Sequence, residues 1–202
     1  MPGLAVYPRP GEAADGLRVH VGDPDAARTL AARLAGLLGE LGYSGEQALV
    51  LCVGSDRSTG DALGPLTGSR LAEMSLPGLM VRGTLDDPVH ATNLERVLAA
   101  TAVRYRDRAL VAVDACLGNP EAVGTISLGR GPLRPGAGVH KRLPEVGDVC
   151  LTGVVNVGGF MEYFVLQNTR LSLVVKMAGV IAEAFRLLVA ESPPQCSGPA
   201  RG

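Results

Sequence analysis

Apolar runs alternate with amphipathic stretches along the chain, and the two patterns predict different elements. ALVLCVG from Ala48 and RALVAVDACLG from Arg108 are apolar almost throughout, which is the signature of strands covered on both faces. Three further runs are strand-like: LMVRGTL from Leu79, VGTISLG from Val123 and VCLTGVVNVGG from Val149. Strands that alternate with helices indicate a parallel or mostly parallel sheet between helical layers.

Four stretches between and after these runs predict helices. Asp23 and Pro24 have the form of an N-cap and a first helical residue, and the apolar 3-4 spacing that follows ends at Gly42. PLTGSRLAEMS and VHATNLERVLAATAVRYRD predict two further helices, and a long C-terminal helix is expected from about Phe160. The Phe, Tyr and Met residues of that last segment are expected to pack in the core.

The remaining segments frame a single domain. We expect a flexible N-terminal arm over residues 1–22, a single α/β hydrolase-like domain over 23–190 and a disordered polar tail over 191–202. The 202 residues are 47% hydrophobic with a formal net charge of -1, so the chain has no basic excess for nucleic-acid binding. The N-terminus lacks a continuous apolar signal-peptide core, and charges interrupt the C-terminal apolar segment too often for a membrane span. A cytoplasmic protein is therefore expected.

The cysteines point to a reducing compartment rather than to a disulfide framework. Cys52, Cys116, Cys150 and Cys196 lack C-x-x-C spacing, and three of them lie in apolar strand-like runs. We interpret them as buried, reduced thiols. Cys116 follows Asp114 by two positions and could be a nucleophile, but no base is indicated near it.

Carboxylates stand after two of the buried strands. Asp61 lies in the turn VGSDRSTGDALGP that follows the first, and Asp114 stands at the carboxyl end of the second. Because neighbouring parallel strands end at one crevice, the two side chains are expected to meet there. Two acids in a partly desolvated cleft can share one proton and activate a water, which allows hydrolysis without a thiol or hydroxyl nucleophile.

Two other interpretations of this pair stay open. The carboxylates can hold a divalent metal if a His or a third carboxylate joins them, and His90 and His140 are candidates. Each Asp can instead cap a turn or a helix N-terminus. The turn lacks the Gly-Lys-Ser/Thr ending of a phosphate-binding loop, and the chain has neither a dinucleotide fingerprint nor a G-x-S-x-G elbow.

Other candidate binding residues lie in loops. The Gly- and Pro-dense loop over residues 129–148 includes His140 and Lys141. It is either a flap that binds an acidic or backbone-carbonyl feature of a substrate, or a solvated surface loop. Asp56 either faces the cleft or closes its turn, and the turn role is favoured.

Several segments resemble the YyaC family of sporulation proteins, which is also described as a spore protease family. They are VGSDRSTGDALGP, VDACLG, GPLRPGAGV with the following Lys141, and TGVVNVGGFMEYFVLQNTRL, and the resemblance runs from about Leu49 to Phe185. The family is similar in turn to the core of the germination protease of endospore-forming bacteria, an aspartic-type endopeptidase that degrades small acid-soluble spore proteins. That likeness places the two catalytic Asp roles on Asp61 and Asp114.

The resemblance also implies a fold. The germination protease is similar to hydrogenase maturation endopeptidases, which implies a three-layer α/β/α sandwich, phosphorylase/hydrolase-like, with a mixed, mostly parallel sheet. In the maturation enzymes, the positions like Asp61 and Asp114 are acidic metal ligands joined by a His, and His140 lies in that region without the His motif. This chain is shorter than the germination protease and has no segment that resembles its propeptide.

Three hypotheses for function follow. The first is a peptidase of sporulation or germination in the mother cell or forespore, without a cofactor or metal ligands, in which Asp61 and Asp114 are catalytic and Asp56, His140 and Lys141 bind substrate. The second is a peptidase that depends on a divalent metal at the same carboxylates. The third is a spore protein that binds a peptide segment without cutting it. The expected partner is a protein or peptide, with small acid-soluble spore proteins as candidates; no nucleic-acid or membrane partner is expected, and a homo-oligomer is compatible with the sequence.

Overall fold

All five runs predicted as strands form strands in the computed structural model, which describes residues 16–135, 143–159 and 161–191. The strands are β1 (Leu17–His20), β2 (Ala48–Cys52), β3 (Met80–Arg82), β4 (Ala109–Gly118), β5 (Thr125–Arg130) and β6 (Val149–Val157). The helices are α1 (Ala26–Glu40), α2 (Leu63–Met74), α3 (Leu94–Arg104), α4 (Glu162–Gln167) and α5 (Leu171–Glu191). Three short 3-10 turns join them: η1 (Gly45–Gln47), η2 (Thr59–Ala62) and η3 (Pro120–Ala122).

The strands of the described residues form one six-stranded sheet in the order β1-β5-β6-β4-β2-β3. The β6-β4, β4-β2 and β2-β3 pairs are parallel, whereas β5 runs antiparallel to both β6 and β1. The predicted mixed, mostly parallel sheet of an α/β fold is therefore confirmed. Because β2, β4 and β6 run in one direction, their carboxyl ends lie at the same edge of the sheet.

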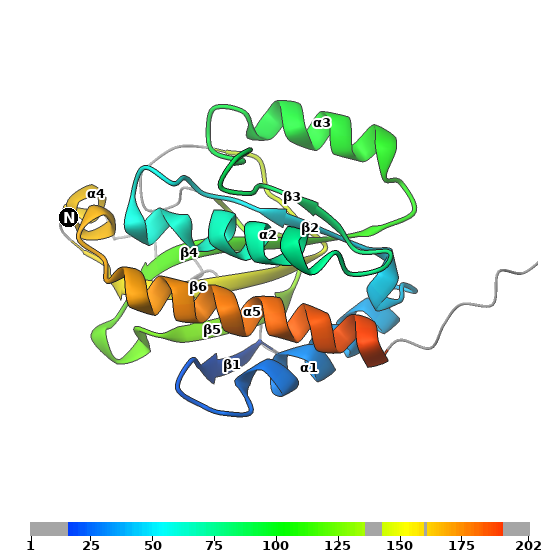
Figure 1. Ribbon diagram of the computed structural model, residues 1–202. Helices are drawn as coiled ribbons and strands as arrows, with labels where there is room; N and C mark the ends of the chain where they lie inside the picture. The colour runs from blue at the N-terminus through cyan, green and yellow to red at the C-terminus, as the bar shows by residue number, and fades with distance from the viewer. Residues whose placement is uncertain (1–15, 136–142, 160, 192–202) are drawn as a thin grey trace, which may run out of the picture.

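Helices cover the two faces of the sheet unequally. The larger core cluster lies on the first face, where α1, α2 and α5 pack against alternate residues of the central strands such as Val111 and Val113. Figure 1 shows α1, α5 and α2 side by side along this face, with α3 apart from them. On the second face, the start of α3 and the loop residues Leu133 and Val146 pack around Ala112. The molecule has the predicted three layers, and its second face is covered partly by a loop.

The expectation of a flexible arm over residues 1–22 was wrong for its last part. Residues 17–20 form the edge strand β1, which pairs antiparallel with β5. The segment LRVH alternates apolar and polar residues, and Val19 is buried against the first-face core. Four residues are enough for an edge strand once one apolar side chain anchors it, although the segment is too short to stand out in the sequence.

Two predicted helix boundaries also needed correction. The first helix begins at Ala26 rather than at Pro24, and Asp23 accepts a hydrogen bond from the Asp25 backbone N–H at 2.9 Å in the preceding turn. The single C-terminal helix is two helices, α4 and α5. It is interrupted because Asn168 Nδ2 donates to the carbonyl of Phe164 at 2.8 Å and Thr169 Oγ1 donates to that of Val165 at 2.9 Å. These bonds occupy the carbonyls at the end of α4.

Among the described helices, none combines the length and apolar composition that a membrane-spanning segment needs.

Candidate functional site

The turn that carries Asp61 is closed by its own backbone. After β2, the Gly54 N–H donates to the carbonyl of Val89 at 2.8 Å, and the Ser55 N–H donates to the carbonyl of Asp61 at 3.0 Å. The Asp61 N–H in turn donates to the carbonyl of Ser58 at 3.0 Å. The loop therefore folds back on the end of β2 and delivers Asp61 in η2, directly before α2.

Two glycines allow the backbone of this turn to approach the end of β2 closely. Gly54 has a φ of 142°, and a Cβ atom there would overlap the carbonyl oxygen of Asp61. A Cβ atom on Gly64, in the first turn of α2, would overlap the carbonyl oxygen of Val53. The glycine-rich composition of VGSDRSTGDALGP thus serves close backbone approach at the end of β2.

Asp114 lies in the middle of its strand, which corrects the sequence-based placement at a strand end. β4 continues to Gly118, and Asp114 pairs with Thr152 of β6. On its other side, β2 pairs with β4 only as far as Cys52 opposite Val113. The neighbouring strand therefore ends where Asp114 begins, and the turn that carries Asp61 takes the place of that neighbour.

The structure brings the two predicted acids within electrostatic reach of each other. Burial raises the pKa of Asp61 to about 6, against the opposing effect of a hydrogen bond from the Ser55 backbone. Asp114 is 8% exposed, and burial together with the charge of Asp61 raises its pKa well above the ordinary range. The Ala115 N–H, which donates to Asp114 Oδ1 at 2.8 Å, acts in the opposite direction. Two buried carboxyls with raised pKa values, one of them raised further by the charge of the other, can share one proton.

Of the other predicted site residues, the structure describes only Asp56. Asp56 is exposed in its turn, where Ser55 Oγ accepts the hydrogen bond from the Arg57 N–H at 3.2 Å. His140 and Lys141 lie outside the described residues. On the described flanks of that loop, Leu133 and Val146 form a backbone bridge and pack in the second-face cluster.

Cys116 does not have the properties of a nucleophile. Burial and the charge of Asp114 raise the pKa of its thiol to about 12, and the hydrogen bond with Thr152 offsets this only in part. Cys52, Cys116 and Cys150 are free thiols among the described residues, and burial also raises the pKa of Cys52 and of Cys150. The fourth, Cys196, lies outside those residues. At neutral pH a thiolate at Cys116 is thus disfavoured.

A metal site was the other interpretation of the pair. Within the described ranges, no three His, Cys, Asp or Glu side chains lie together in a way that could hold a metal ion. His90 instead binds locally before α3, where its Nδ1 lies 2.9 Å from Thr92 Oγ1. The donors that the structure describes at the pair are two carboxylates, which is fewer than a protein metal site ordinarily uses.

The helix α4 packs against the turn that carries Asp61. A Cβ atom on Gly60 would lie 2.7 Å from Leu166 Cδ2 and 2.8 Å from Thr169 Oγ1, so only a glycine allows this approach. Asn156, near the end of β6, donates from Nδ2 to the carbonyl of Val165 and to Thr169 Oγ1, both at 3.2 Å. The end of β6, α4 and η2 are thereby joined next to Asp61.

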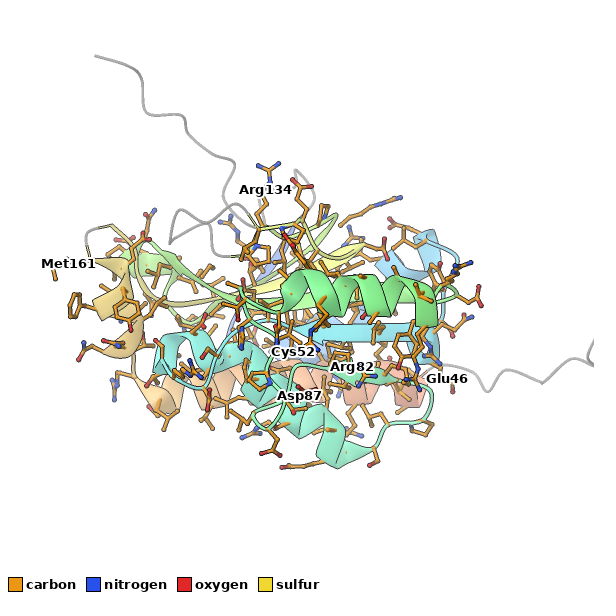
Figure 2. All side chains as sticks on the ribbon, turned by 90° about the horizontal axis from the view of Figure 1, so that it is seen from above. Glu46, Cys52, Arg82, Asp87, Arg134 and Met161 are labelled. Atoms are coloured by element: carbon orange, nitrogen blue, oxygen red, sulfur yellow. The ribbon has the colours of Figure 1, made fainter. Side chains whose placement is uncertain are left out.

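The expectation that the Phe, Tyr and Met residues of the C-terminal segment pack in the core is confirmed for Met177 and Phe185 of α5 and was wrong for the apolar side chains at α4. Met161, Tyr163 and Phe164 are 52%, 61% and 54% exposed, and the two rings meet edge to face with centroids 6.0 Å apart. Figure 2 shows Met161 at one end of the molecule and Glu46, just before β2, at the other. The exposed apolar surface therefore lies at the same end as the acid pair.

Comparison with known proteins identifies the family. Residues 18–184 match the family described as "Protein of unknown function (DUF1256)". The chain belongs to the DUF1256 family. A relative, the uncharacterized protein YyaC of Bacillus subtilis (strain 168), is 54% identical over 144 residues, which are 71% of this chain and 70% of that protein. The resemblance to the YyaC family that the motifs indicated is confirmed.

A solved structure provides a more distant likeness. The [NiFe] hydrogenase maturation protease HycI from Thermococcus kodakarensis KOD1 has a TM-score of 0.45 and 18% sequence identity, over 69% of this chain and 93% of that one.

The sequence of this DUF1256 protein did not reveal every residue at the site. Asn156 and Thr169 were missed because each is an isolated polar residue whose role depends on how α4 meets η2. The polar residues of this segment predicted either a cap or a cleft wall, and the structure shows that Asn168 ends α4. Ser58, whose buried Oγ has no hydrogen-bond partner among the described residues, carries no sequence signal.

Proposed function

We propose that this protein is a peptidase in which Asp61 and Asp114 share a proton and activate a water molecule. The observation that carries the proposal is the pairing of two carboxyls, each with a raised pKa, from distant parts of the chain. Acids whose pKa values are raised by burial and by the charge of a neighbouring acid are more typical of catalytic sites than of helix or turn caps. The likeness of both motifs to those of the germination protease supports the same two residues.

The different environments of Asp61 and Asp114 give them different roles, as general base and general acid. We assign the base to Asp61, whose pKa is raised to about 6, and the proton donor to Asp114, whose pKa is raised well above its ordinary range by burial and by the charge of Asp61. Asp61 takes a proton from water as the water oxygen bonds to the peptide carbonyl carbon, and Asp114 gives its proton to the carbonyl oxygen. The C–N bond then breaks as Asp61 protonates the leaving nitrogen and Asp114 recovers a proton from the hydroxyl.

This division predicts a bell-shaped dependence of kcat/KM on pH. The rate should rise as pH increases through about 6, where Asp61 loses its proton, and should fall at higher pH when Asp114 also ionises. A fluorogenic peptide assayed across this range gives the two apparent pKa values of the pair. A rate that keeps rising into alkaline pH would contradict the role of Asp114 as proton donor.

The substrate that we propose is a protein or peptide, with small acid-soluble spore proteins as the first candidates. This choice, and a role in sporulation or germination in the mother cell or forespore, rest on the resemblance of the motifs. The low charge of the chain supports neither nucleic acid nor membrane as a partner.

Mass spectrometry of small acid-soluble spore proteins incubated with the purified protein tests the proposed function. We expect cleavage that persists with a chelator and disappears in Asp61→Asn. Cleavage that the chelator abolishes would replace the shared-proton mechanism with a metal-dependent one. Absence of cleavage from these proteins and from a peptide mixture, together with peptide binding, would favour the binding protein instead.

A further inference from the structure

A row of polar residues crosses the second face of the sheet and ends at Asp114. Arg18 of β1 pairs with Ser127 of β5, Ser127 pairs with Thr152 of β6, and Thr152 pairs with Asp114. Residues directly opposite in paired strands point to the same face. Their neighbours on the other face belong to the first-face core: Val19, Ile126, Leu128, Leu151 and Val113. The row therefore joins the edge strand β1, by its strand register, to the acid pair (Figure 1).

Arg18 stands at the exposed end of this row. Arg18 is exposed, whereas Ser127 and Thr152 are buried at 5% and 3% exposure. The strands of Arg18 and Asp114 are three strand spacings apart, about 14 Å. Among the influences on the thiol of Cys116, two residues beyond Asp114, burial and Asp114 raise its pKa while the charge of Arg18 lowers it. The positive charge thus acts on Cys116, two residues beyond the acid on the same strand.

Within the described part of the chain, the Arg18 guanidinium forms no ion pair with a carboxylate. The ion pairs there join Arg33 and Arg130 to Glu40, Arg134 to Glu145, and Arg186 to Glu183. Arg18 belongs to none of them. An exposed guanidinium offers a planar set of donors that matches a carboxylate in a bidentate arrangement.

We propose that Arg18 anchors a carboxylate of the polypeptide substrate beside the acid pair. The carboxylate belongs either to an acidic side chain or to the substrate's C-terminus. An extended peptide spans the distance between the two strands with about four residues, so the anchored group lies within about four residues of the cleaved bond. This inference rests on the proposed function, and it adds a substrate class: peptides with a negative charge near the scissile bond.

The anchor can be tested by binding, separately from cleavage. The Asp61→Asn variant is titrated into short fluorescein-labelled peptides of Ala, Leu and Gly that carry one Glu, with Gln counterparts and with free or amidated C-termini. We expect Arg18→Ala to weaken binding of the charged peptide roughly tenfold or more and to leave the uncharged peptide unchanged. The Glu/Gln and acid/amide arms identify which carboxylate is bound.

Two further variants distinguish an anchor from a structural effect. Arg28→Ala removes a comparable exposed arginine on α1, across the sheet from Arg18, and should change nothing. Arg18→Glu should reverse the preference, so that a peptide with Lys binds better than one with Glu. Equal affinity for charged and uncharged peptides, or no binding of any peptide, would overturn the anchor. Failure of the proposed function would be seen in the cleavage assay instead, where the unmodified protein would not cut its substrates.

Discussion

Replacing Asp61 by Asn is expected to abolish hydrolysis and at the same time to stabilise the folded protein. The loss of rate should be on the order of a thousandfold, because general acid and base groups contribute about 10²–10⁴. The folded state raises the pKa of Asp61 from 3.8 to about 6, so it binds the proton more tightly than the unfolded chain does. Stability therefore falls as pH rises from about 4 to about 6, where the unfolded carboxyl has ionised and the folded one must follow.

Asn at this position removes the charge and keeps the shape. The free energy of unfolding should rise by about 1–2 kcal/mol at pH above 6 and by less at acidic pH. Denaturant titrations at two pH values, beside the peptide assay, measure both effects. Asp114→Asn should behave in the same direction, since its Oδ1 can still accept the bond from the Ala115 N–H.

A matched control is available at the other end of β4. Asp107 is exposed just before the strand begins, and Asp107→Asn should leave cleavage unchanged. If Asp61→Asn lowered stability at every pH, Asp61 would be a structural cap of its turn, and the shared-proton mechanism would be wrong.

The second large effect is expected at Gly54. Alanine there would meet a φ of 142°, which side chains rarely adopt, and its Cβ atom would overlap the carbonyl oxygen of Asp61. We expect a loss of about 3–5 kcal/mol in the free energy of unfolding and loss of cleavage, because the turn that carries Asp61 must open. Thermal denaturation and the peptide assay measure the two losses.

Substitutions at two other glycines serve as controls for Gly54→Ala. Gly36 lies inside α1 with nothing within 4 Å of an added Cβ atom, so Gly36→Ala should stabilise the protein by about 0.5–1 kcal/mol. If Gly54→Ala does not fold, Gly60→Ala provides a less severe change, because its closest backbone contact, the Leu166 carbonyl oxygen, lies 2.9 Å from an added Cβ atom rather than 2.1 Å. A Gly54→Ala protein with normal stability and activity would contradict the close approach described for this turn.

Much of the architecture could be predicted because the core strands are long and apolar. ALVLCVG and RALVAVDACLG became the central strands β2 and β4, and the same pattern led to Asp61 and Asp114. The prediction that Asp114 stands at the carboxyl end of its strand was wrong, because Asp114 lies in the middle of β4. Strand length depends on the neighbours: β6 continues to pair with β4 beyond Asp114, whereas β2 does not.

What could not be predicted depends on contacts between distant segments. β1 is only four residues long, and Arg18 acquires its place near the acid pair through the register of three strand pairings. The break before α5 depends on side-chain bonds of Asn168 and Thr169 that compete with helical continuation. The exposure of Tyr163 and Phe164 follows from the position of α4 at the sheet edge, which periodicity does not encode.

The separation of the two acids along the chain has a consequence for the protein as it is made. Asp61 precedes β3 and α3, Asp114 follows them, and β6, which supports Asp114 through Thr152, comes later still. A chain emerging from the ribosome therefore carries Asp61 long before its partner can be placed beside it, because parallel pairing needs the whole crossover. Under the proposed function, the order of synthesis leaves the unfinished chain without a complete acid pair until its last strand has been added.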